Sequence, residues 1–211
     1  MKLYGFAISN FYNIVKLGLL EKQFEFEEIP TPPSNQAELL AHSPMGKIPF
    51  FQHGNCFLSE SQAILFYLEL LKPNPRLYPV EPERGARAQQ IHQFIDLYVD
   101  PEARTLLKAM RNPEQVDDAR INASCERLVY NIQALSQLVE FAPFIAGEKL
   151  SHADLAAFMT FNFAQSMMGR FSDQDPLARL PGVGAYMGMM EQRDSCQRVL
   201  ADQQQALASL G

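Results

Sequence analysis

The chain has 211 residues, of which 47% are hydrophobic and 20% charged, as in an ordinary soluble globular protein with one large domain or two small ones. Its formal net charge of -6 and pI near 5.2 argue against nucleic acid or an anionic membrane surface as a partner. The three cysteines are widely separated, which argues against a disulfide framework or a zinc cluster. With neither a signal-peptide pattern nor a long apolar run, these features predict a cytoplasmic protein that spans no membrane.

A proline-rich segment divides the chain. Residues 72–83 include four prolines, which cannot continue a helix or a central strand. Before this segment the signals alternate between strand and helix, and after it they are almost purely helical. We therefore predict a first domain over residues 1–77, a linker over 78–83 and an all-helical domain over 84–211.

The first domain is predicted to be a small α/β sandwich with the order β-α-β-α-β-β-α. Period-two alternation marks half-buried strands, and apolar residues three or four apart mark helices. The predicted strands cover residues 2–7, 24–27, 48–51 and 56–58, and the predicted helices cover residues 11–21, 36–41 and 61–71.

In the second domain the pattern predicts a long amphipathic helix over residues 84–110, bent or interrupted at Pro101. A second helical stretch runs from 112 to about 139, and another from 181 to 193. Between them, Ser151 and Asp154 have the spacing of a capping box, which predicts a helix over residues 152–168.

The most informative segment is 46–62. A proline stands at the entrance to an apolar strand, a hairpin turn follows, and the returning strand runs directly into Ser59-Glu60-Ser61 at the start of an apolar helix. A helix start presents N–H groups that have no partner within the helix, and these attract anions. The segment therefore predicts a site for a small peptide-like anion.

Two motifs carry a resemblance to a known family. Gly-Lys-Ile-Pro at residues 46–49 precedes Leu-Ser-Glu-Ser-Gln-Ala-Ile at 58–64, and a proline-rich linker and a capping box at Ser151 follow. Over essentially its whole length the chain resembles the cytosolic glutathione S-transferases, in particular the serine-type members. The resemblance implies a thioredoxin-like, glutathione-binding N-terminal domain and an all-α C-terminal domain that forms the electrophile pocket.

The resemblance also implies how glutathione, the co-substrate, would be bound. Pro49 corresponds to a cis-proline that leaves the backbone of Ile48 facing the cysteinyl moiety of the ligand. Ser61 would take the γ-glutamyl carboxylate, Glu60 the ammonium group, and Lys47 would lie near the glycyl carboxylate. The local pattern alone favours the simpler interpretation, that Glu60 and Ser61 only cap a helix, and the Ile48-Pro49 motif before them favours glutathione binding.

The resemblance places a thiol-activating group near the end of the first strand, and Ser9 falls on the serine-type position. Its hydroxyl, aided by the helix N-terminus, would donate a hydrogen bond to the thiolate and lower the pKa of the thiol. Tyr12, in the first turn of the helix, and Asn10 are the alternatives. Tyr4 is interpreted as a core residue.

The electrophile pocket is expected against the helix predicted over residues 84–110, with Tyr98, Arg104 and Met110 as candidate lining residues. At helical spacing such residues also fit a core or a solvated face. The histidines are scattered without metal-ligand spacing, so no metal site is predicted.

The function implied is that of a homodimeric glutathione transferase that conjugates glutathione to a hydrophobic electrophile, as in detoxification. Two alternatives stay open. One is a non-catalytic binding or regulatory protein of the same fold, of the stringent-starvation type. The other is a glutathione-dependent isomerase of a maleyl-type acid.

Overall fold

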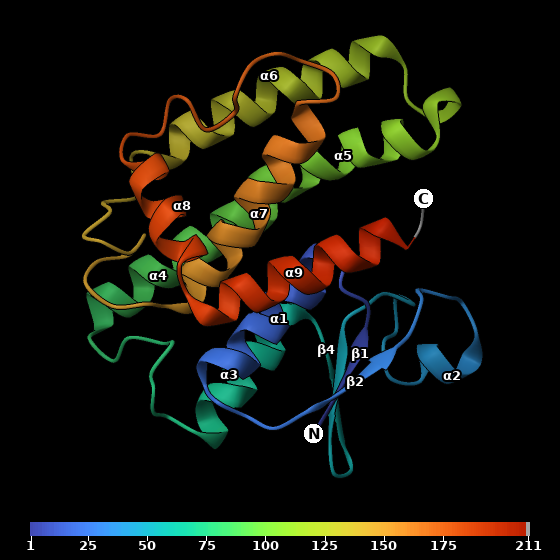
Figure 1. Ribbon diagram of the computed structural model, residues 1–211, viewed down its shortest axis with the longest axis vertical. Helices are drawn as coiled ribbons and strands as arrows, with labels where there is room; N and C mark the ends of the chain where they lie inside the picture. The colour runs from blue at the N-terminus through green and yellow to red at the C-terminus, as the bar shows by residue number, and fades with distance from the viewer. Residues whose placement is uncertain (210–211) are drawn as a thin grey trace. The chain divides into compact units, whose positions relative to one another are not determined.

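The computed structural model describes residues 1–209, which fall into two compact units (Figure 1). The first unit comprises Met1–Tyr78 together with the C-terminal residues from Glu191 onward. The second, helical unit comprises Pro79–Met190. The last two residues of the predicted helical domain, 210 and 211, lie outside the described residues.

The first unit is built on a four-stranded mixed sheet in the order β2-β1-β3-β4. Strands β1 and β2 are parallel, whereas β1–β3 and β3–β4 are antiparallel. This arrangement confirms the predicted thioredoxin-like α/β domain. In chain order its elements are β1 (Lys2–Gly5), α1 (Asn10–Glu21), β2 (Glu27–Pro30), α2 (Ala37–Leu40), β3 (Phe50–His53), β4 (Cys56–Ser59) and α3 (Ser61–Leu71).

The core of this unit lies between the sheet and the helices α1 and α3, which pack against each other. Leu3 of β1 and Phe51 of β3 are cross-strand neighbours and therefore point to the same face of the sheet. Helical positions three or four residues apart cover that face. They are Tyr12, Val15 and Leu19 of α1, and Ile64 and Leu68 of α3.

Strand β2 begins at Glu27, three residues later than the start predicted from the alternation over residues 24–27. Its partner β1 begins at Lys2, which pairs with Glu27, so the residues before Glu27 have no strand to pair with. Phe24 and Phe26 still pack against the core. Since side chains alternate along a strand, Glu28 points to the same face, towards α1.

The last helix, α9 (Asp194–Ala208), belongs to the first unit, whereas the sequence analysis assigned it to the helical domain. In Figure 1 α9, drawn in red, lies along the blue α1. Arg193 makes two hydrogen bonds to the Glu21 carboxylate, of 2.9 and 2.7 Å. Asp202 Oδ2 lies 2.7 Å from Lys16 Nζ. The partners are far apart in sequence, so local periodicity does not reveal the pairing.

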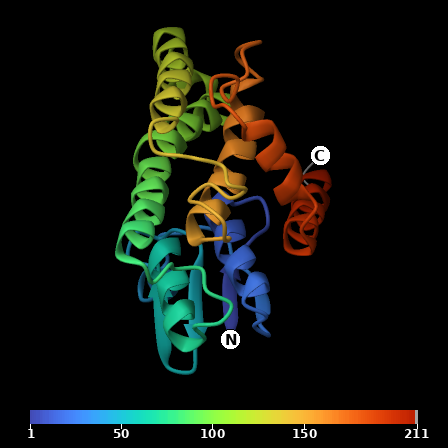
Figure 2. The same cartoon turned by 90° about the vertical axis from the view of Figure 1, so that its left-hand side faces the viewer.

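The helical unit contains α4 (Pro82–Phe94), a π-helical turn (Ile95–Val99), α5 (Asp100–Arg111), a 3₁₀ turn (Pro113–Gln115), α6 (Asp118–Leu135), α7 (His152–Met168) and α8 (Val183–Glu191). Figure 2 shows the green α5 and the yellow-green α6 side by side. The interruption predicted at Pro101 takes the form of the π-helical turn. The backbone stays helical through Val99 and Asp100, and the π-helical turn ends just before Pro101, which has no N–H to donate to the preceding turn.

The capping box predicted at the start of α7 is confirmed. Asp154 is completely buried, and its Oδ2 accepts hydrogen bonds from the Ser151 N–H at 2.8 Å and the Ser151 hydroxyl at 2.9 Å. Its Oδ1 accepts the Ile145 N–H at 2.8 Å. Burial raises the pKa of Asp154 to about 6, although these three bonds favour the ionised form.

Asp154→Ala is expected to lower the free energy of unfolding by about 2 kcal/mol, because two buried N–H groups lose their acceptor. The matched control is Asp117→Ala, which removes the exposed cap of α6, and a loss of about 1 kcal/mol or less is expected there. Urea unfolding followed by circular dichroism measures both. Equal losses would contradict a special role for the buried cap.

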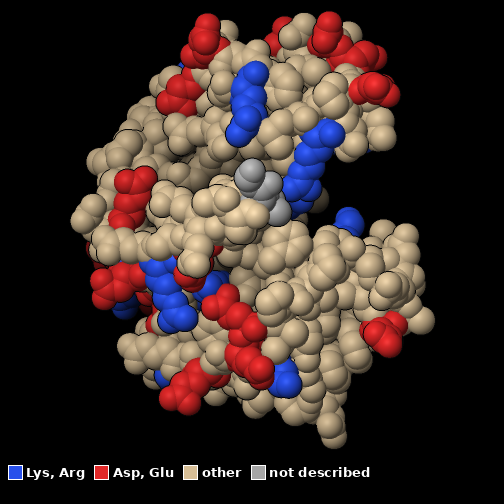
Figure 3. All heavy atoms as spheres, turned by 45° about the vertical axis from the view of Figure 1, so that its right-hand side comes forward, with Lys and Arg blue, Asp and Glu red and all other residues tan. Residues whose placement is uncertain are grey.

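The charged residues at the surface are of both signs. On the face drawn in Figure 3, Lys and Arg side chains are interspersed with Asp and Glu. No helix within residues 1–209 combines the length and the hydropathy that crossing a membrane requires. Within the same residues, no group of three or more His, Cys, Asp and Glu side chains is arranged to hold a metal ion.

Candidate functional site

The pairing register of the sheet brings the predicted glutathione residues to one place. Tyr4 pairs with Phe50, and Phe50 pairs with Ser59. The segments that follow β1, precede β3 and follow β4 therefore meet at one end of the sheet. In that order, these segments hold Ser9, Lys47–Pro49 and Glu60–Ser61.

The segment before β3 presents unpaired backbone. The peptide bond between Ile48 and Pro49 is cis, as the sequence analysis expected. Strand pairing starts only at Phe50, and the Ile48 backbone makes no hydrogen bond to another residue of the described chain. Ile48 is half-buried and Lys47 exposed. An extended ligand can therefore pair with the Ile48 N–H and C=O groups as an added strand would.

The segment after β4 is a sharply turned helix start. Glu60 has a φ of 68°, in the left-handed region, which costs a non-glycine residue about 1–3 kcal/mol. This turn leads the strand into α3, whose first residue is Ser61. Glu60 is exposed and makes no side-chain capping bond, while Ser61 is only 7% exposed. The turn sets a free carboxylate beside a helix N-terminus, an arrangement that suits both charges of an amino acid group.

Ser9 is the N-cap of α1. Its hydroxyl oxygen accepts a hydrogen bond from the Tyr12 N–H at 3.4 Å, and its own N–H donates to Phe6 O at 3.0 Å. The Ser9 side chain is half-buried. A hydroxyl that accepts through its oxygen still has its hydrogen to donate. Ser9 can therefore cap the helix and donate to a ligand at the same time.

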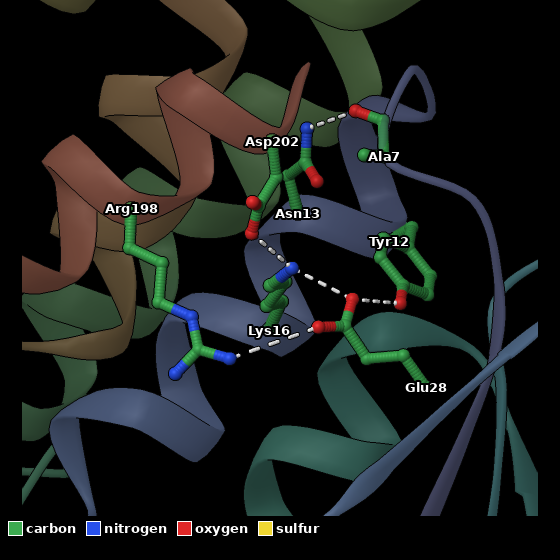
Figure 4. Close-up of polar contacts among 7 residues, drawn as sticks. All are labelled: Ala7, Tyr12, Asn13, Lys16, Glu28, Arg198 and Asp202. Carbon is green, nitrogen blue, oxygen red and sulfur yellow. Dashed lines mark hydrogen bonds and ion pairs between the residues drawn. The ribbon is translucent and has the colours of Figure 1, made fainter. Parts of the chain in front are cut away.

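The hydroxyl of Tyr12, the main alternative to Ser9, is already occupied. Tyr12 is 2% exposed, and its hydroxyl donates to Glu28 Oε2 at 2.5 Å, where Lys16 Nζ also binds (Figure 4). Burial, followed by the Glu28 carboxylate, raises the pKa of Tyr12 above its ordinary range. A buried hydroxyl that donates to a carboxylate is a poor donor to a thiolate. Asn10, the other alternative, is also buried.

The three residues expected at the electrophile pocket lie on the π-helical turn and on α5 of the helical unit. Tyr98 is half exposed, and its carbonyl accepts a hydrogen bond from Asn131 at 2.6 Å. Arg104 is hydrogen-bonded to Asp100. Met110 lines a hollow of about 610 Å³ within the helical unit, to which Tyr98 and Arg104 do not contribute.

This hollow is formed by the end of α5, the start of α6 and the segment after α7. Val116, Ile121 and Phe171 contribute apolar surface, while Asp118 and Arg170 contribute charge. Arg170 and Phe171 were not among the residues predicted from the sequence. They follow the end of a helix in a segment with no periodic pattern, and nothing local links them to Met110.

Known proteins share this combination of fold and motifs. A family model described as the glutathione S-transferase N-terminal domain matches residues 3–76. A glutathione S-transferase from Pseudomonas putida is 31% identical over 207 residues, which cover 98% of this chain and 94% of that protein.

Solved structures agree with these relatives in fold. The chain aligns with glutathione transferase F2 from Populus trichocarpa with a TM-score of 0.81 at 23% identity, covering 97% of this chain and 99% of that one. It also aligns with a maleyl pyruvate isomerase, a bacterial zeta-class glutathione S-transferase, with a TM-score of 0.79 at 22% identity, covering 94% and 96%. Since the Pseudomonas relative matches across nearly the whole of both chains, this protein belongs to the glutathione S-transferase family.

Proposed function

We propose that this protein binds glutathione at the end of its sheet, stabilises the thiolate and transfers it to a hydrophobic electrophile. The observation that carries the proposal is the unpaired Ile48 backbone, next to a cis-proline and opposite the turned start of α3. Such a site offers backbone pairing to a peptide-like ligand, and a carboxylate beside a helix N-terminus to its amino acid end.

Each part of glutathione has a proposed partner. The Ile48 backbone pairs with the cysteinyl moiety. The Ser61 hydroxyl and the helix-start N–H groups take the γ-glutamyl carboxylate, while Glu60 takes the ammonium group. The exposed Lys47 lies at the glycyl carboxylate. The strained Glu60 backbone supports this assignment, because strain of this kind is concentrated at ligand sites.

Ser9 is the proposed thiolate partner. Its oxygen is held by the Tyr12 N–H, its hydrogen is able to donate to sulfur, and it stands at the positive end of the α1 dipole. A donor hydrogen bond to the thiolate lowers the thiol pKa and raises the fraction of the nucleophilic form. The bond between Tyr12 and Glu28 supports this choice over Tyr12.

For the electrophile we propose the hollow that Met110 lines in the helical unit. Its volume is suitable for a small molecule, and Met110 and Phe171 give it an adaptable apolar wall. Tyr98 and Arg104 do not line it and are kept only as secondary candidates.

Arg170 favours a second candidate function, the glutathione-dependent isomerisation of a maleyl-type acid. It supplies a cation to the hollow that can bind a carboxylate, although Asp118 opposes an anion there. The structural likeness to a maleyl pyruvate isomerase is consistent with this alternative. Product analysis separates the two functions, since a transferase consumes glutathione and an isomerase returns it unchanged.

We further propose a cytoplasmic homodimer. Phe66, Leu70 and Leu71 of α3 are 51%, 64% and 40% exposed, respectively, so one side of this helix presents large apolar groups to solvent. An isologous contact through such a face would bury them in a second copy of the chain.

Ser9→Ala is expected to raise the pKa of the bound glutathione thiol by about one to two units, with little change in glutathione affinity. At a pH below the thiol pKa, kcat/KM should fall roughly 10- to 100-fold in parallel. The ultraviolet absorbance of the thiolate, titrated against pH in the binary complex, measures the pKa. Isothermal calorimetry measures the affinity.

Glu60→Ala is the control for this experiment, since it should weaken glutathione binding and leave the thiol pKa unchanged. If Ser9→Ala leaves the pKa where it was, the assignment of Ser9 is wrong. If the unmodified protein produces no binding heat with millimolar glutathione, the non-catalytic alternative replaces the transferase.

A further inference from the structure

The loop between β1 and α1 is tied to the helix by a buried amide. Asn13 Nδ2 donates to the carbonyl oxygen of Ala7 at 2.7 Å, one turn beyond the helix start (Figure 4). The same loop is closed by the Ser9 N–H, which donates to Phe6 O at 3.0 Å. The tethered carbonyl therefore belongs to the turn that delivers Ser9 to the head of α1.

To make this bond, Asn13 buries an amide oxygen that is left without a partner among the described residues. Its side chain is completely buried, and its Oδ1 has no hydrogen-bond partner in the described part of the chain. A buried polar atom left in that state costs about 1–3 kcal/mol, so an apolar side chain would suit a purely structural position better. The orientation of the amide is set by its partner, because only the NH₂ group can donate to a carbonyl. What the residue contributes is therefore the bond to the loop.

The helix that carries Asn13 is itself a firm support. Within one turn on either side, Tyr12 bonds to Glu28, and Lys16 Nζ lies 2.6 Å from Glu28 and 2.7 Å from Asp202. These contacts fix α1 to β2 on one side and to α9 on the other (Figure 4). A tether from this helix therefore holds the loop in a defined place, and a shift of that loop by a fraction of an ångström would move the Ser9 hydroxyl.

We infer that Asn13 is a positioning residue, which holds the Phe6–Ser9 turn through the Ala7 carbonyl so that the Ser9 hydroxyl points at the glutathione sulfur. The inference rests on the proposed function of Ser9. Asn13 itself touches neither sulfur nor electrophile. It acts on the thiol pKa only through Ser9.

The test is Asn13→Leu, which keeps a similar volume and removes the donor together with the unsatisfied oxygen. The folded fraction and the glutathione affinity should change little, whereas the pKa of the bound thiol should rise by about one unit. At a pH below the thiol pKa, kcat/KM should then fall about tenfold. Asn13→Ala is the second variant in case Asn13→Leu packs badly. Asn162→Ala, which removes an amide bond to the Phe158 carbonyl at 2.9 Å, is the matched control and should leave the pKa unchanged.

A double-mutant cycle with Ser9→Ala decides how Asn13 acts. If it acts through Ser9, adding Asn13→Leu to Ser9→Ala should shift the thiol pKa no further. Additive pKa shifts in the double mutant would overturn the inference. So would an unchanged thiol pKa in both Asn13 variants when Ser9→Ala raises it. In either case the proposed function of Ser9 would stand. An unchanged pKa in Ser9→Ala itself would reject Ser9 as the thiolate partner, and the inference with it.

Discussion

Lys16→Met should lower the free energy of unfolding by about 2–3 kcal/mol, less than the cost of breaking a fully buried ion pair, because the carboxylates of Glu28 and Asp202 are 33% and 38% exposed. The Lys16 side chain is only 2% exposed, and its Nζ contacts two carboxylates, of Glu28 at 2.6 Å and of Asp202 at 2.7 Å. Because both carboxylates contact the same Nζ atom, removing the ammonium group leaves two like charges close together. Arg198, at 3.9 Å from Glu28, compensates only one of them. Chemical denaturation at neutral pH measures the loss.

The matched control is Lys2→Met. Lys2 also pairs with a glutamate of β2, but its pair with Glu27 is 3.7 Å long and both side chains are largely exposed. A loss of at most about 1 kcal/mol is expected there, because water screens such pairs. Neutralising the orphaned carboxylates, by adding Glu28→Gln and Asp202→Asn to Lys16→Met, should restore part of the stability. If Lys2→Met and Lys16→Met lower the free energy of unfolding by the same amount, the contacts of Lys16 with Glu28 and Asp202 stabilise the fold no more than an exposed ion pair does.

The second large effect is a loss of stability in mild acid, caused by a buried histidine pair in the helical unit. The Nδ1 atoms of His92 and His152 are 2.8 Å apart, and both side chains are completely buried. One ring donates to the other, which requires at least one neutral ring. Burial lowers the pKa of His92 to about 4, and burial together with the charge of His92 lowers that of His152 well below its ordinary value.

The sign of the effect follows from proton binding. In the unfolded chain both histidines take up protons near pH 6.5. In the folded protein the pKa of His92 is about 4 and that of His152 lies well below its ordinary value, so both rings stay neutral to a lower pH. Their contribution to stability is therefore complete above about pH 7 and is lost as the pH falls through this window. For His92 alone the loss amounts to about 3 kcal/mol. Asp154 works in the opposite direction, because its raised pKa lets the folded state bind a proton more tightly between about pH 6 and pH 4.

The two imidazoles lower the stability in acid by more than the one carboxylate raises it, so the free energy of unfolding should fall overall. Urea unfolding at a series of pH values between 7.5 and 4.5 measures this fall. His92→Asn removes one titrating ring and should make the stability depend less on pH. Asp96 lies 3.6 Å from His92 Nε2, so Asp96→Asn is the control for a carboxylate that would attract the protonated form. A stability that is constant over this range would contradict the effect of the pair.

Much of the fold and of the glutathione half of the site follows from short stretches of sequence. The bounds of α3, the presence of a hairpin before it and the capping box of α7 agree with the structure, because each depends on residues within a few positions of one another. The first hairpin strand covers Phe50–His53 instead of the predicted residues 48–51. The cap of α1 is equally local, since Ser9 accepts the N–H of Tyr12 three residues later. The cis bond before Pro49 was expected from the family pattern rather than from the residues alone.

Other features depend on partners far away in the chain. The hydroxyl of Tyr12 is directed to Glu28, 16 residues later, and Lys16 reaches Asp202, 186 residues away. The start of β2 depends on where β1 begins. The hollow at Met110 is completed by Arg170 and Phe171, which no periodic pattern marks.

By itself, then, the sequence determined the family, the two kinds of domain and the hairpin that joins the Ile48 segment to the helix start at Ser61, because these rest on local backbone preferences and short motifs. Only the tertiary structure decided that the Tyr12 hydroxyl bonds to Glu28, that Asn13 bonds to the turn before Ser9 and that α9 packs on α1. A hydrogen bond or an ion pair depends on distances of a few ångströms between atoms, and for residues far apart in the chain only the folded structure sets those distances.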